Sequence, residues 1–90
     1  MQIKYHRRFL KNYRKRIAPD KNLANRFKQR LELRLKDPAG AIIKDHRLIG
    51  KLKQYRSFSV TGDIRAVYQI EDDIIKLYDI GSIRHHQRAL

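Results

Sequence analysis

The stretch from Leu48 to Ser82 constrains the fold most, because it contains three short segments rich in β-branched and aromatic residues. These segments predict β-strands over residues 54–60, 64–71 and 73–80. The connections at 61–63 and 71–73 are so short that the strands they join must be antiparallel neighbours. The sequence therefore predicts a three-stranded antiparallel meander.

The middle segment alternates between two kinds of side chain. One set is largely apolar and the other is mixed: Ile64, Ala66, Tyr68 and Ile70 against Arg65, Val67 and Gln69. Because successive side chains of a strand point to opposite faces, one face of the sheet is expected to pack on a core. Arg65 belongs to the mixed face, and we expect function there.

Two amphipathic helices are predicted before the meander, after a possible first strand at residues 2–5. Apolar residues recur every three to four positions in the segments 6–18 and 20–36: Phe9, Tyr13 and Ile17, then Ala24, Phe27, Leu31 and Leu35. Pro19 ends the first helix, and Asp20 is a suitable N-cap for the second. The two helices are expected to form a hairpin over one face of the sheet.

A chain of 90 residues predicts one domain, residues 1–90, with little room for a deep pocket. The element order predicts an α+β fold in which an N-terminal strand and a helical hairpin pack on an antiparallel sheet. The sequence has no apolar run long enough to span a membrane, no secretory signal and no cysteine. We therefore expect a cytoplasmic protein without a membrane partner or a cysteine-based metal site.

Charge indicates the kind of partner. The chain has 22 Lys and Arg against 9 Asp and Glu, a formal net charge of +13. Such a balance favours nucleic acid over a membrane surface or an acidic protein alone, and an acidic partner would relieve the self-repulsion. Basic side chains of the predicted helices could bind phosphate or could simply form a solvated face: Arg7, Arg8, Lys11, Arg14, Lys15, Arg16, Arg26, Lys28, Arg30 and Arg34.

Four sequence motifs resemble the RelE superfamily of type II toxins, and most closely its YafQ-like branch. They are Lys44-Asp45-His46 with Leu48, then Gly50-Lys51-Leu52-Lys53-Gln54-Tyr55-Arg56, then Gly62-Asp63-Ile64-Arg65-Ala66-Val67-Tyr68, and Asp79-Ile80-Gly81-Ser82. The resemblance extends over nearly the whole chain in element order, and its specific part is the second half.

The resemblance implies a metal-independent endoribonuclease (mRNA interferase) that cleaves messenger RNA held in the ribosomal A site, without a cofactor. The RNA 2′-hydroxyl attacks the adjacent phosphorus, so the reaction needs a base, an acid and cations. Histidine suits proton transfer because it titrates near neutral pH, and arginine offers phosphate a fixed fork of donors. The implied catalytic residues are His46, Asp63, Arg65 and His85.

Each of these residues also has a structural interpretation. His46 could pack the turn before the sheet, Asp63 could be a turn former beside Gly62, and Arg65 could form a cross-strand salt bridge. Lys51 and Lys53 are expected to contact the RNA backbone, and Arg56 either to contact RNA or to hold the structure. The set of expected RNA contacts is Lys51, Lys53, Arg56, Arg84 and His86.

The chain departs from the branch at two places. Ser59 stands where the branch usually carries a second histidine in the first strand of the meander. The terminal motif is altered after Ser82, so that either Ile83 replaces its histidine or His85 takes that place after an insertion, which we favour. In both alignments the aromatic residue that would stack a base is missing.

The same fold leaves two other functions open. A ParE-like toxin would bind DNA gyrase and would not need the histidines, and a non-enzymatic module would only bind RNA. A metal site at His85-His86 is not expected, because adjacent side chains point apart. For the toxin, the resemblance implies a cognate acidic antitoxin that neutralises it.

Overall fold

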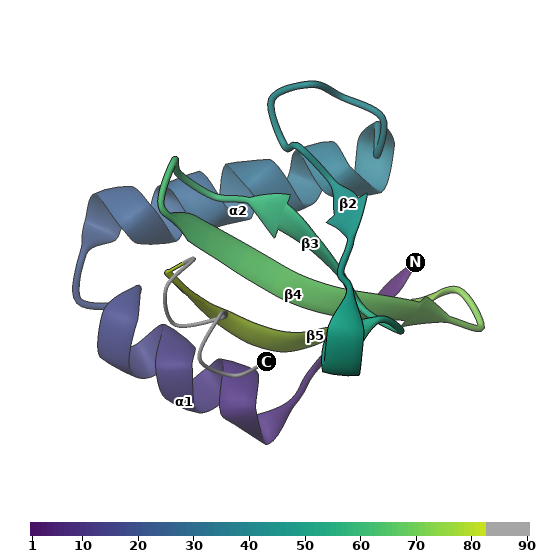
Figure 1. The fold of residues 1–90 in the computed structure, drawn as a ribbon. Helices are drawn as coiled ribbons and strands as arrows, with labels where there is room; N and C mark the ends of the chain where they lie inside the picture. Colours follow the sequence, from purple (N-terminus) through teal and green to yellow (C-terminus); the bar gives the residue numbers. More distant parts are fainter. Residues whose placement is uncertain (83–90) are drawn as a thin grey trace.

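The computed structural model describes residues 1–82, which form one five-stranded sheet and two helices (Figure 1). The elements follow in the order β1 (Gln2–Tyr5), α1 (Arg7–Arg16), α2 (Lys21–Lys36), β2 (His46–Arg47), the 3₁₀ turn η1 (Gly50–Leu52), β3 (Arg56–Ser59), β4 (Ile64–Glu71) and β5 (Ile74–Ser82). The sheet order is β1-β5-β4-β3-β2. The predicted α+β fold is confirmed.

The predicted meander corresponds to β3, β4 and β5, which pair antiparallel in sequence order. β3 is shorter than predicted, and β5 begins one residue later and continues to Ser82. Asp72 and Asp73 connect β4 to β5 with positive φ angles of 53° and 61°. Two such residues make the type I′ turn whose twist matches a hairpin.

The first strand joins the sheet in a way that the sequence did not indicate. β1 pairs in parallel with β5, with Gln2 opposite Ile74 and Tyr5 opposite Leu77, so the sheet is mixed. β2 adds a two-residue antiparallel strand beside β3, with His46 opposite Ser57. A strand at His46 was not predicted, and it fixes the position of that histidine relative to the meander.

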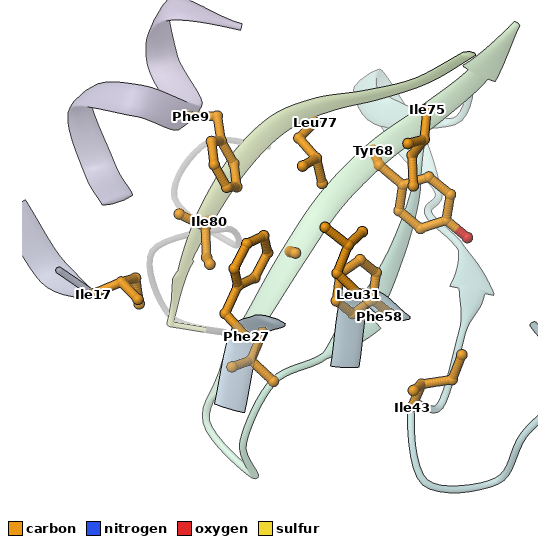
Figure 2. Close-up of a cluster of buried hydrophobic side chains, with 12 residues drawn as sticks. Phe9, Ile17, Phe27, Leu31, Ile43, Phe58, Tyr68, Ile75, Leu77 and Ile80 are labelled. Carbon is orange, nitrogen blue, oxygen red and sulfur yellow. The ribbon is translucent and has the colours of Figure 1, made fainter. Parts of the chain in front are cut away.

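Both helices pack on one face of the sheet, α1 mainly against β5 and α2 against β3 (Figure 1). Figure 2 shows the core between them, where Phe9 of α1 and Phe27 of α2 contact each other at 5.6 Å between ring centroids. From the sheet, Phe58, Tyr68 and Ile80 point into the same core. Leu35, predicted within the apolar stripe of α2, is instead 38% exposed.

The helix boundaries follow local chemistry. Asp20 caps α2 as predicted, because its carboxylate accepts hydrogen bonds from the backbone N–H groups of Asn22 and Leu23. His6 caps α1 by accepting from the N–H of Arg8. Within residues 1–82, no helix is long and apolar enough to cross a membrane.

Candidate active site on the open face of the sheet

The face of the sheet opposite the helices carries the candidate site, and we call it the open face. Phe58 and Ala66 are register partners that point into the core. Since side chains alternate along a strand, their neighbours Ser57 and Arg65 point to the open face. Arg65 lies in β4, with a strand on each side, so its backbone is held firmly.

The guanidinium of Arg65 is held by three neighbouring residues. Its Nε donates to Ser57 Oγ at 2.8 Å, and its Nη2 donates to the carbonyl oxygens of Lys44 at 2.7 Å and Ser57 at 3.1 Å. Nη2 also lies 3.1 Å from His46 Nδ1. Within residues 1–82, no carboxylate pairs with Arg65 and its Nη1 has no partner. The expected alternative, a cross-strand salt bridge, is therefore not observed in this region.

His46 lies beside Arg65 at the start of β2. Its Nδ1 is 3.0 Å from the carbonyl oxygen of Lys44 and 3.1 Å from Arg65 Nη2. Because an arginine nitrogen can only donate, Nδ1 accepts from Arg65 in the tautomer that carries the proton on Nε2. In the other tautomer Nδ1–H donates to the carbonyl oxygen of Lys44, and Nε2 carries the lone pair that can take a proton.

Lys44 has an unusual backbone conformation that helps to form the site. Its φ is +46°, in the left-handed region that a residue with a side chain rarely adopts. This conformation precedes the start of β2, and the carbonyl of Lys44 accepts the 2.7 Å hydrogen bond from Arg65. The strained residue therefore lies within the contact set of the candidate catalytic arginine.

Asp45, between Lys44 and His46, points the other way and anchors this segment in the protein. Its side chain is only 1% exposed. Its carboxylate accepts from Arg56 Nε at 2.7 Å and from the hydroxyl of Tyr68, and it forms an ion pair with Arg34, whose Nε lies 2.6 Å away and donates to the Tyr68 oxygen. Asp45 thereby ties the start of β2 to α2, β3 and β4.

The Asp45 cluster shifts the protonation equilibria of its members. Burial raises the pKa of the Tyr68 hydroxyl, and the hydrogen bond to Asp45 acts in the same direction. The hydrogen bond to Asp45 raises the pKa of Arg56. By contrast, burial lowers the pKa of Arg65, and Asp45 only partly offsets this. Asp45 is therefore paired with Arg34 and Arg56, whereas Arg65 is partly desolvated and has no carboxylate partner within residues 1–82.

A second buried carboxylate, Asp79, ties β5 to α1. It accepts hydrogen bonds from Asn12 Nδ2 at 2.6 Å, Arg8 Nε at 3.0 Å and the backbone N–H of Ile80 at 2.8 Å. Burial alone would raise the pKa of Asp79, but these hydrogen bonds outweigh it and lower the pKa. Asp79 is thus an ionised structural group.

The structure brings together only some of the predicted site residues. His46 and Arg65 are in contact, whereas Asp63 lies exposed in the β3–β4 turn, where its N–H donates to Thr61 Oγ1. Among the described residues, no contact joins the Asp63 carboxylate to His46 or Arg65. Ser59 donates its hydroxyl to the carbonyl oxygen of Thr61.

The predicted RNA contacts are also only partly placed. Lys51 and Lys53 are exposed in and after η1, between β2 and β3. Arg56 uses its Nε for Asp45 but keeps 40% of its side chain exposed. Arg84, His85 and His86 lie outside the described residues.

One predicted surface residue is buried, and three site residues were missed. Arg34 was placed with the exposed cations of the helices, which is wrong, because it is 8% exposed and pairs with Asp45. Ser57 and Lys44 were missed as contacts of Arg65, and Asp45 as the anchor. Asp45 is the middle residue of the Lys44-Asp45-His46 motif. Its acidic side chain in so basic a chain could have indicated a partner for arginine.

Comparisons with known proteins identify the family and support the fold. A family model described as the bacterial toxin of type II toxin-antitoxin system, YafQ, matches residues 1–88. YafQ from E. coli strain BL21(DE3) is 26% identical, with a TM-score of 0.76 over 94% of this chain and 96% of that chain. No curated protein sequence matches the chain.

Two further solved structures are similar over almost their full length. A copper-bound mutant toxin from Helicobacter pylori is 29% identical, with a TM-score of 0.75 over 94% of this chain and 97% of that chain. The E. coli DinJ-YafQ toxin-antitoxin complex contains a chain that is 26% identical, with a TM-score of 0.69 over 93% of each chain.

Proposed function

We propose that this chain, which belongs to the YafQ family of bacterial type II toxins, is a metal-independent endoribonuclease that cleaves messenger RNA on the ribosome. The observation that supports it best is the state of Arg65. A half-buried guanidinium is fixed by Ser57, Lys44 and His46, and within the described residues it has no carboxylate partner. Such a group suits an anion that binds from outside.

Arg65 is the proposed stabiliser of the transition state. Attack of the 2′-hydroxyl on phosphorus produces a phosphorane with extra negative charge on its oxygens. The unused Nη1 of Arg65 can donate to these oxygens while Nε and Nη2 stay bound to the protein. Because the donors are already oriented, little reorganisation is needed as the charge develops.

His46 is the proposed proton-transfer group. In the tautomer whose Nδ1–H donates to the carbonyl oxygen of Lys44, its Nε2 carries a lone pair and can take a proton from the RNA. One step removes the proton of the 2′-hydroxyl, and the other delivers a proton to the departing 5′-oxygen. The products are a 2′,3′-cyclic phosphate and a 5′-hydroxyl.

The other roles remain those that the family resemblance implies. His85 is proposed as the second proton-transfer group and Asp63 as an orienting group or base. Lys51, Lys53, Arg56, Arg84 and His86 are proposed to contact RNA. The first two are exposed in the segment between β2 and β3, which is consistent with this role.

We further propose a cognate acidic antitoxin, with the toxin acting in the cytoplasm. The net charge of +13 favours an acidic partner, and β1 forms an edge of the sheet within the described residues. An apolar groove of about 460 Å³ lies beside that edge, lined by Ile3, Tyr13 and Leu35 among others. Purification of the chain from its native operon should yield a small acidic protein in the same complex, and purification without one would contradict this part of the proposal.

The decisive experiment is to induce the gene alone in cells and map the 5′ ends of messenger RNA by primer extension. The parent should produce cuts within codons. Arg65→Ala should abolish them, whereas the control Arg26→Ala, which removes an exposed arginine of α2, should not. Growth arrest by the parent without any cuts would reject the ribonuclease and favour a gyrase-binding toxin.

A further inference from the structure

Two tyrosines stack across the open face close to the candidate active site. The ring centroids of Tyr55 and Tyr78 are 4.6 Å apart, with an angle of 21° between the ring planes. Tyr55 immediately precedes β3. Tyr78 belongs to β5, where the pairing with β4 shifts its register between Val67 and Tyr68. Because β4 lies between these two strands, the rings meet over β4.

The register places the tyrosine pair beside Arg65. Tyr55 precedes Ser57 by two residues, so both side chains point to the open face, and Ser57 is bound by Arg65. Two residues of a strand span about 6–7 Å. A nucleotide whose phosphate binds Arg65 can therefore place its own base, or the next one, at the tyrosines.

The two rings differ in what covers them. One face of Tyr78 is covered by Tyr55, and the guanidinium of Arg8 lies over its ring at 5.6 Å, with His6 at 5.0 Å. Tyr55 has no aromatic or cationic neighbour other than Tyr78 among the described residues. Arg8 and Tyr55 thus both contact the ring of Tyr78, and the partly exposed Tyr55 carries no further ring or cation within residues 1–82.

The backbone holds Tyr55 in place from both sides. Its N–H donates to the carbonyl oxygen of Leu52 at 2.9 Å, and its carbonyl oxygen accepts from the N–H of Leu48 at 3.0 Å. The exposed Lys53 lies two residues before it. A fixed aromatic face beside backbone-binding cations is the combination that binds single-stranded nucleic acid.

We propose that the outer face of Tyr55, backed by Tyr78, is a stacking platform for an RNA base next to the phosphate that Arg65 binds. This inference rests on the proposed function only in that the ligand is RNA. The platform supplies from β3 and β5 the aromatic contact that the altered C-terminal motif lacks.

The test compares two 2′-O-methyl RNA oligomers, which cannot be cleaved because the attacking hydroxyl is blocked. One carries normal bases, and the other has the same backbone with abasic sites. Tyr55→Leu should weaken binding of the first by roughly 5- to 150-fold, the effect of losing one stacked base, and leave binding of the second unchanged. Tyr55→Phe should bind like the parent.

The control is Tyr5→Leu, which removes a 47% exposed tyrosine on β1 and should leave both affinities unchanged. Equal losses with both oligomers, or no loss with either, would overturn the platform. Nuclear magnetic resonance of the parent tests it without a variant, since the Tyr55 ring signals should shift upfield only with the base-containing oligomer. RNA binding without cleavage would reject the ribonuclease and leave the platform standing.

Discussion

The charge of Arg65 distinguishes it from the other arginines that touch the sheet. Arg8, Arg34 and Arg56 each bind a carboxylate, whereas within residues 1–82 Arg65 has no carboxylate partner. Three of its contacts are to a hydroxyl and two carbonyl oxygens, which fix its direction without cancelling its charge. An arginine that is paired with a carboxylate would have to break that ion pair in order to bind a phosphate, whereas Arg65 would not.

Replacing Arg65 should lower the cleavage rate with little effect on the fold. Arg65→Ala should reduce cleavage by about 10²–10³, the scale seen when one preorganised donor is removed. Arg65→Lys should recover little of this, because an ammonium cannot contact Ser57 and Lys44 and still offer a second nitrogen. Single-turnover cleavage of a message on ribosomes measures both. A lysine variant as fast as the parent would show that only the charge matters.

The histidines should control how cleavage depends on pH. His46→Ala or His85→Ala should lower the rate by about 10²–10⁴ and change the shape of the pH–rate profile, since each removes a proton-transfer group. Ser59 cannot replace either histidine, because a serine hydroxyl does not titrate near neutral pH. If the variant with both changes still cleaves message like the parent, the proton-transfer assignment is wrong.

At the scale of elements, the short strand β2 depends on one buried side chain. β2 has two residues and, in the part of the chain that the structure describes, pairs only with β3, so its own hydrogen bonds hold it weakly. Asp45 adds contacts to Arg34, Arg56 and Tyr68 immediately before it. The positions of Lys44 and His46 at Arg65 therefore depend on a carboxylate that never meets the substrate.

Removing the charge of Asp45 should affect both stability and catalysis. Asp45→Asn leaves two guanidiniums without their anion and should lower the free energy of unfolding by about 3–5 kcal/mol. The control Asp72→Asn removes an equal charge from an exposed turn and should change the stability little, because asparagine tolerates the positive φ of that position. Urea unfolding followed by circular dichroism measures both. Equal stability of the two variants would contradict the anchoring role.

Asp79, at the junction of α1 and β5, should make the free energy of unfolding depend on pH in the acidic range. The pKa of Asp79 in the folded protein is below its ordinary value of 3.8, so its contribution is present above pH 3.8. As the pH falls, the unfolded chain takes up the proton first, and the contribution is lost by the time the folded pKa is passed. Asp79→Asn should cost about 2 kcal/mol at pH 7, and this cost should shrink as the pH falls below 3.8. If the stability loss of Asp79→Asn did not change with pH, the charge of Asp79 would not contribute to stability.

At the scale of the whole molecule, the basic side chains that bind RNA must be distinguished from those that only add to the net charge. The exposed cations of α1 and α2 lie on the helical side, whereas Lys51 and Lys53 lie in the segment between β2 and β3. Phosphate contacts release counterions, so RNA affinity should fall steeply with salt. The two sides of the molecule can be compared by removing two charges from each.

Lys51→Gln with Lys53→Gln should weaken RNA binding and lower the slope of log affinity against log salt by up to about 1.4. The matched pair Lys21→Gln with Lys36→Gln, at the exposed ends of α2, should have a smaller effect. The sites cut should stay the same, since phosphate contacts carry no sequence information. Equal effects of the two pairs would show that total charge alone governs binding.

The sequence by itself determined the elements whose cause is local. Alternation with a period of two defined β4 and assigned Arg65 to the open face, because neighbouring side chains of a strand must point apart. Helical periodicity, Pro19 and the Asp20 cap defined α1 and α2 within a few residues. The family motifs directed attention to His46 and Arg65, which the structure places in contact.

Tertiary structure alone decided which charges are paired and which remain available. Arg34 has the sequence environment of a surface cation, but it is buried because the chain returns Asp45 to it after the loop that follows α2. The parallel pairing of β1 with β5, the contact of Arg65 with the Lys44 carbonyl 21 residues away and the stack of Tyr55 on Tyr78 likewise join distant segments. Local periodicity shows which way a side chain points, but partners far apart in sequence are chosen by the packing of the whole chain.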